Sequence, residues 1–146
     1  MKILVVVLLL QASVAASAQE RSSATCGASL SHAYSFFTPR GDGAATEGDF
    51  NSDGAADFAL LLEEKASPHK AAIGVCLSNE PRPLLIISPY VSAKIFTKPK
   101  GTEYMDVDTE STDIYERDAI SVSDGECCGA SYILRAGAFV QVVDSD

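Results

Sequence analysis

The chain has 146 residues and carries 20 acidic side chains against 11 basic ones, which gives a formal net charge of −9 at pH 7. We therefore do not expect this acidic chain to bind nucleic acid, because proteins bind a phosphate backbone through lysine and arginine. The length suffices for one domain with its own core.

The first 18 residues have the features of a secretory signal peptide in the usual order. Lys2 precedes an apolar run at residues 3–10, and Ala16-Ser17-Ala18 then fits the small-x-small pattern of a cleavage site. The run is shorter than the roughly 20 apolar residues that a membrane-spanning helix needs. We therefore expect a signal peptide at residues 1–18. The mature domain at residues 19–146 is then exported, periplasmic or secreted, with no membrane insertion after cleavage.

A short helix is predicted over residues 26–37. Leu30, Tyr34 and Phe37 recur there at the spacing i, i+4, i+7, which places them on one side of a helix. Pro39 and the glycine-containing turn after it end the helix.

The stretch D-F-N-S-D-G-A-A-D at residues 49–57 sets side-chain oxygens at loop positions 1, 3, 5 and 9, with glycine at position 6. Calcium takes six to eight oxygen ligands, and a tight loop can supply them from alternate residues plus one main-chain carbonyl. Gly54 permits the sharp turn, because a positive φ is cheap only for glycine. The carboxylates repel one another without a cation, so we expect the ion to order the loop. The predicted Ca²⁺ ligands are Asp49, Asn51, Asp53, the Ala55 carbonyl and Asp57.

An EF-hand is excluded. Its calcium loop lies between two helices and has Glu at loop position 12, but position 12 of this loop is Leu60. The pattern D-x-N-x-D-G-x-x-D followed by an apolar strand resembles the FG-GAP or VCBS-type calcium loops of integrin-like proteins. Since the chain carries one copy, it is most similar to the small exported single-copy bacterial type. The resemblance covers residues 48–62, and it implies that the loop joins two strands and that the same five residues bind the metal. The alternative is a turn rich in Asp and Gly that binds no metal.

The rest of the chain is a series of apolar runs separated by turns. The first two runs pair naturally as a hairpin, and Ala136-Gly137 separates the last two as in a tight hairpin. We therefore predict a mainly β fold, an antiparallel meander sheet of about six or seven strands with one short N-terminal helix, with α+β as a variant. The predicted strands are residues 58–62, 72–78, 84–88, 119–123, 131–135 and 138–143, with residues 91–97 and 103–107 as further candidates.

A second acidic stretch lies at residues 106–113. It lacks the glycine, and its last acid is out of register with the pattern of the first loop. We expect a solvated charged loop there.

Four cysteines are present, and an even number in an exported chain favours disulfides. A bridge between the adjacent Cys127 and Cys128 closes a strained small ring, so we expect Cys26 and Cys76 each to pair with one of those two. The sequence leaves open which pairs with which. A zinc site is the alternative, but the chain has no C-x-x-C.

No G-x-S-x-G motif is present, and His32 and His69 stand apart in a predicted helix and a predicted turn. We therefore expect a non-enzymatic, calcium-stabilised exported protein that binds another protein or an envelope component. Two alternatives stay open. One is a periplasmic inhibitor or immunity protein against a basic hydrolase, for which acidic charge is suited. The other is a hydrolase of unrecognised type.

Overall fold

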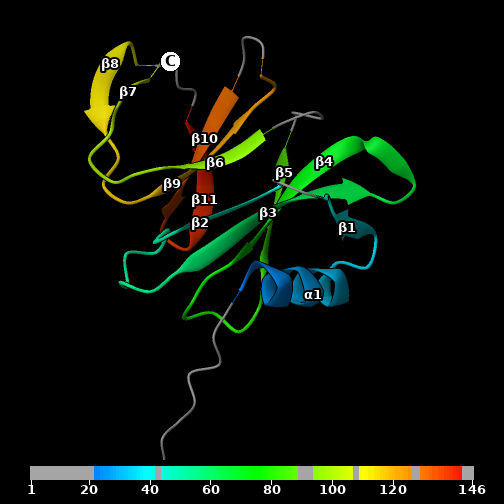
Figure 1. Cartoon of the computed structure of the whole chain (residues 1–146). Helices are drawn as coiled ribbons and strands as arrows, with labels where there is room; N and C mark the ends of the chain where they lie inside the picture. The colour runs from blue at the N-terminus through cyan, green and yellow to red at the C-terminus, as the bar shows by residue number, and fades with distance from the viewer. Residues whose placement is uncertain (1–21, 42–43, 89–93, 107–108, 126–128, 143–146) are drawn as a thin grey trace, which may run out of the picture.

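The computed structural model describes residues 22–41, 44–88, 94–106, 109–125 and 129–142, and the predicted signal peptide lies outside them. Within these ranges the chain forms one helix and eleven strands, which confirms the mainly β class with a single short helix (Figure 1). The elements are α1 (Ser23–Ala33), β1 (Phe37–Pro39), β2 (Ala45–Gly48), β3 (Asp57–Glu64), β4 (Ser67–Cys76), β5 (Leu84–Ser88), β6 (Lys94–Lys98), β7 (Glu103–Asp106), β8 (Ser111–Ile114), β9 (Ala119–Ser123), β10 (Gly129–Arg135) and β11 (Ala138–Val142).

The strands are divided between two sheets and a separate hairpin, all with antiparallel pairing, whereas the sequence predicted one meander sheet. The first sheet has the order β1-β3-β4-β5, with β2 also paired to β3, and the second has the order β11-β10-β9-β6. The hairpin consists of β7 and β8. The split follows from β3 and β4, which are apolar on both faces and therefore need a cover on each side.

The first sheet is the central layer of the molecule. On one face, Ala59 and Leu61 of β3 pack with Ile73 and Val75 of β4 against the second sheet. Residues from both sheets share this core, so the two sheets form a sandwich. The second sheet contributes Ile95, Ile120, Val122, Ala130, Tyr132 and Leu134.

The opposite face of the first sheet is covered by α1 (Figure 1). The helix begins after Ser22, whose hydroxyl accepts the Thr25 N–H at 3.2 Å as an N-cap. Its buried residues are Cys26, Gly27 and Leu30, so both its limits and its buried face lie N-terminal to those predicted. The shift has a physical reason, since Phe37 and Pro39 belong to β1 and are paired with β3.

Leu30 fills a space that Gly74 leaves open in β4. A Cβ at position 74 would lie 2.4 Å from Cδ2 of Leu30, which is far inside van der Waals contact. The missing side chain therefore sets how closely the helix approaches the sheet.

The β7–β8 hairpin lies at the far end from α1 and covers part of the second sheet (Figure 1). Tyr104 of β7 stacks on Tyr115 with ring centroids 4.5 Å apart, and both rings share a buried cluster with Ile133 and Val142. In the part of the chain that the structure describes, no helix is long and apolar enough to cross a membrane.

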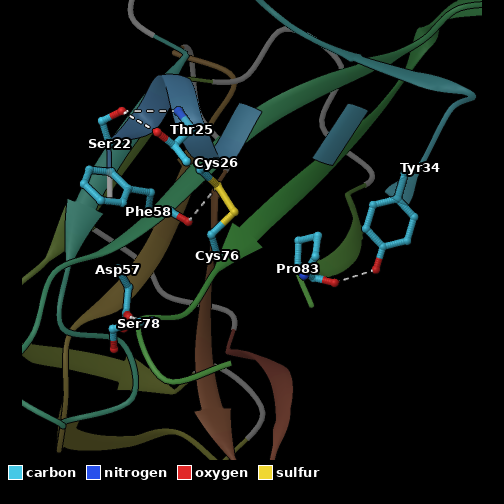
Figure 2. The surroundings of a disulfide bond; sticks show 9 residues. All are labelled: Ser22, Thr25, Cys26, Tyr34, Asp57, Phe58, Cys76, Ser78 and Pro83. Atoms are coloured by element: carbon cyan, nitrogen blue, oxygen red, sulfur yellow. Dashed lines mark hydrogen bonds between the residues drawn. A yellow bond between two sulfur atoms is a disulfide. The ribbon is translucent and has the colours of Figure 1, made fainter. Parts of the chain in front are cut away.

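A disulfide joins Cys26 of α1 to Cys76 at the end of β4, 50 residues apart in sequence (Figure 2). The prediction that each would pair with Cys127 or Cys128 is therefore wrong, and the latter two lie outside the described residues. The physical reason is that α1 docks on β4, which places these two cysteines in contact. Closing a loop of this length stabilises the fold by about 4 kcal/mol on the chain-entropy argument.

Candidate calcium loop

The acidic loop connects β2 to β3, which are neighbouring antiparallel strands. Gly48 and Asp57 are opposite each other in the register, so the residues between them close one end of this strand pair. The loop therefore joins two strands, and its ends are fixed by the sheet.

Asp49, Asn51 and Asp53 are brought together at the tip of the loop. The Asp53 N–H donates to Oδ1 of Asp49 at 2.9 Å and to Oδ1 of Asn51 at 3.0 Å. The Asn51 side-chain amide in turn donates to Oδ2 of Asp53 at 2.9 Å. Three of the four side chains that the sequence singled out are thus within one hydrogen-bonded group.

The backbone of the loop turns as its glycine predicts. Gly54 has a φ of +81°, and a Cβ at this position would meet no atom within 4 Å, so the need for glycine is conformational. Its N–H donates to Oδ2 of Asp49 at 3.0 Å. Ala55 is exposed, and its N–H donates to Oδ1 of Asp53 at 2.9 Å. Successive N–H groups therefore face the carboxylates at positions 1 and 5.

Asp57, at the ninth loop position, is completely buried and supports the loop from within. Its Oδ2 accepts the N–H groups of Phe50 at 2.8 Å and Asn51 at 3.2 Å. Its Oδ1 accepts the Ser78 N–H at 2.6 Å. Burial raises the pKa of Asp57, and these hydrogen bonds, which favour the carboxylate, oppose the rise.

Ser78 and Asn79 join the site from the segment after β4, and nothing in the local sequence pattern points to them. The Ser78 hydroxyl donates to Oδ2 of Asp53, and the Asn51 amide donates to Oδ1 of Asn79 at 3.0 Å. The hydrogen bond from Ser78, followed by that from the Ala55 N–H, lowers the pKa of Asp53. This segment therefore stabilises the ionised form of a candidate ligand.

Asp118 is a further carboxylate that the sequence pattern did not identify. Its Oδ2 accepts the Asp49 N–H and its Oδ1 accepts the Lys100 N–H, both at 2.9 Å. A Cβ added to Gly48 would lie 3.1 Å from Oδ2 of Asp118 and 2.7 Å from Cε1 of Phe50. The close approach at this glycine lets Asp118, which precedes β9, tie the start of the loop to the second sheet.

The residue types fit calcium, which prefers carboxylate, amide and carbonyl oxygens. The Oδ1 atoms of Asp49 and Asn51 flank one N–H group, and Asp53 is hydrogen-bonded to Asn51. Asp57 faces main-chain N–H groups: its Oδ2 accepts two of them and its Oδ1 accepts a third. Among the described residues, no three His, Cys, Asp or Glu side chains converge as a metal-binding group. In this structure hydrogen bonds hold the loop, both within it and to Ser78, Asn79 and Asp118.

Comparison of the chain with protein-family models, with curated protein sequences and with solved structures gave no match. The resemblance of residues 48–62 to FG-GAP or VCBS-type loops therefore stays a prediction from the sequence.

Proposed function

We propose that this chain is a calcium-binding protein in which the ion orders the β2–β3 loop. The observation that supports the proposal most directly is the group formed by Asp49, Asn51 and Asp53, which gathers their side-chain oxygens around the loop backbone. Asp57 and the Ala55 carbonyl complete the proposed ligand set.

A bound Ca²⁺ supplies positive charge to a loop that has none of its own. Three carboxylates lie within nine residues, and Asp118 brings a fourth to the Asp49 N–H. The loop hydrogen bonds hold these groups in place but leave their charges uncompensated. An ion that binds the folded loop therefore stabilises the native state, and calcium at extracellular concentration suffices for sites with dissociation constants of about 10⁻⁴–10⁻³ M.

We further propose that the protein is exported and acts by binding another protein or an envelope component, not by catalysis. Three features support this: the signal-like N-terminus, the Cys26–Cys76 disulfide, which suits an oxidising compartment, and an excess of acidic charge that favours a basic partner surface.

The test is thermal unfolding of residues 19–146 in EDTA and across a calcium titration. Wild type is compared with Asp53→Ala and with Asp113→Ala, an exposed acid outside the loop. We expect calcium to raise the melting temperature of wild type and of Asp113→Ala, by a stabilisation of about 2.7 kcal/mol at a hundredfold excess over Kd. The shift should be lost in Asp53→Ala. If millimolar calcium moves none of the three, the loop is only a turn and the proposal fails.

A further inference from the structure

The Cys26–Cys76 disulfide lies next to the segment that reaches into the calcium loop (Figure 2). Ser78 follows Cys76 by two residues. It donates its N–H to Oδ1 of Asp57 at 2.6 Å and its hydroxyl to Oδ2 of Asp53. The residue that connects two predicted ligands is therefore held close to a covalent anchor.

The same disulfide also touches the strand that follows the loop. Cys76 is opposite Phe58 in the β3–β4 register, and Phe58 is the residue after Asp57. Sγ of Cys26 lies 3.9 Å from the Phe58 carbonyl oxygen. The bond thus fixes the helix, the end of β4 and the start of β3 relative to one another, at the end of the sheet where the loop begins.

Both cysteines are largely buried, with 4% of Cys26 and 8% of Cys76 exposed. A hollow nevertheless lies against the bond. Its walls include the two cysteines, Thr25, Ser29, Glu80 and Pro83. The bond therefore forms part of the wall of this hollow.

We propose that the Cys26–Cys76 disulfide controls the calcium affinity of the β2–β3 loop: reduction of the bond weakens calcium binding, and bound calcium protects the bond from reduction. This regulation rests on the proposed calcium-binding function. The reductant is a dithiol, which is the chemical class that thiol–disulfide exchange requires.

The exchange proceeds in two displacements. One thiolate of the dithiol attacks a sulfur of the bond, forms a mixed disulfide and releases the other cysteine as a thiolate. The second thiolate of the reductant then displaces the remaining cysteine. Two electrons pass to the protein, Cys26 and Cys76 each gain one proton from the dithiol, and the dithiol leaves as a disulfide.

Reduction removes the anchor two residues before Ser78 without changing any predicted ligand. Outer partners that orient metal ligands typically contribute 10–100-fold to affinity, so we expect calcium affinity to fall by about tenfold or more. Because coupling between two equilibria is reciprocal, saturating calcium must disfavour reduction by the same factor. A tenfold factor corresponds to about 30 mV for this two-electron couple.

The experiment measures calcium affinity of the exported chain by calorimetry, before and after reduction with dithiothreitol, with circular dichroism to verify that both forms are folded. In parallel, the chain is equilibrated in dithiothreitol redox buffers with and without calcium. Differential alkylation and peptide mass spectrometry then report the Cys26–Cys76 bond separately from Cys127 and Cys128.

Two serine variants keep the bond intact and test the route through Ser78 even if the reduced chain unfolds. We expect Ser78→Ala to lose affinity in the oxidised state. We expect Ser121→Ala to retain it, because this buried hydroxyl pairs with Ser131 in the second sheet, at 2.6 Å.

Weaker binding by the reduced chain and by Ser78→Ala, with a calcium-dependent redox equilibrium, supports the inference. Unchanged affinity in both, or a redox equilibrium that calcium does not move, overturns it and leaves the calcium proposal standing. An oxidised chain that binds no calcium overturns both.

Discussion

Two acidic segments of this chain have similar charge but different surroundings. In the loop at residues 49–57, the carboxylates accept main-chain N–H groups, and Asp57 is completely buried. The segment at residues 106–113 runs into β8, and all four residues of β8 are exposed. Asp113 there accepts the adjacent Ile114 N–H, at 2.8 Å, and contacts the Tyr104 hydroxyl at 3.5 Å.

The difference shows that the amount of charge does not define a site. The loop at residues 49–57 combines alternate oxygens with a glycine at positive φ, and it receives Ser78 and Asp118 from distant parts of the chain. The segment at residues 106–113 lacks the glycine spacing, and Glu110 and Asp113 are exposed as predicted, although residues 111–113 belong to strand β8 and not to a loop.

The largest contrast between the two segments is expected on removal of one carboxylate from each. Asp57→Ala leaves the N–H groups of Phe50, Asn51 and Ser78 without their acceptor, and each buried unpaired group costs about 1–3 kcal/mol. We expect a loss of about 3 kcal/mol or more in the free energy of unfolding, measured by urea denaturation in EDTA. Asp113→Ala should change it by less than about 0.5 kcal/mol. Equal midpoints for the two variants would remove the distinction between the segments.

A smaller effect should separate backbone strain from metal binding. Gly54 has a φ of +81°, and Gly101, in the turn between β6 and β7, has a φ of +85°. A Cβ added at either position would meet no atom within 4 Å. Alanine at either position should therefore cost about 1 kcal/mol of stability. Only Gly54→Ala should also weaken calcium binding, measured by calorimetry. A loss of affinity in Gly101→Ala as well would mean that the effect is global and not specific to the loop.

The smallest expected effect is a loss of stability at alkaline pH that involves Tyr104 of the β7–β8 hairpin. Burial, followed by the charge of Asp113, raises the pKa of Tyr104 above its ordinary value of 10.0. The unfolded chain therefore loses this proton first. The stability from neutral Tyr104 is present below pH 10 and is lost as pH rises through the folded pKa. Urea unfolding between neutral and strongly alkaline pH should show a shallower decline for Tyr104→Phe. An equal decline of stability with pH in wild type and in Tyr104→Phe would contradict this prediction.

The fold class could be predicted because apolar periodicity and turn residues are local signals. The hairpin around Ala136-Gly137 is confirmed, with both residues at positive φ, and so is the pairing of β3 with β4. The short strands β1, β2 and β8 were missed. β1 and β2 are only partly buried and their pairing depends on β3, and β8 is fully exposed and pairs with β7 alone. The division into two sheets also could not be predicted, since it depends on which faces meet and not on local pattern.

The candidate site was predictable only where its residues are adjacent in sequence. Asp49, Asn51 and Asp53 are brought together as their spacing indicates, and Gly54 adopts the expected turn. The contribution of Ser78 could not be predicted, because the β3–β4 pairing brings it to the loop. The disulfide partner of Cys26 was mispredicted for the same reason, since it depends on where α1 docks.

The space at Gly74 has a consequence for the order of folding. An isolated helix of 11 residues is marginal in water, and α1 buries Cys26, Gly27 and Leu30 against a surface that β3 and β4 build together. The receiving space for Leu30 exists only after these strands have paired, although α1 is synthesised before either of them. The earliest described element of the chain is therefore one of the last to become stable, and the Cys26–Cys76 bond can close only when the hairpin is in place.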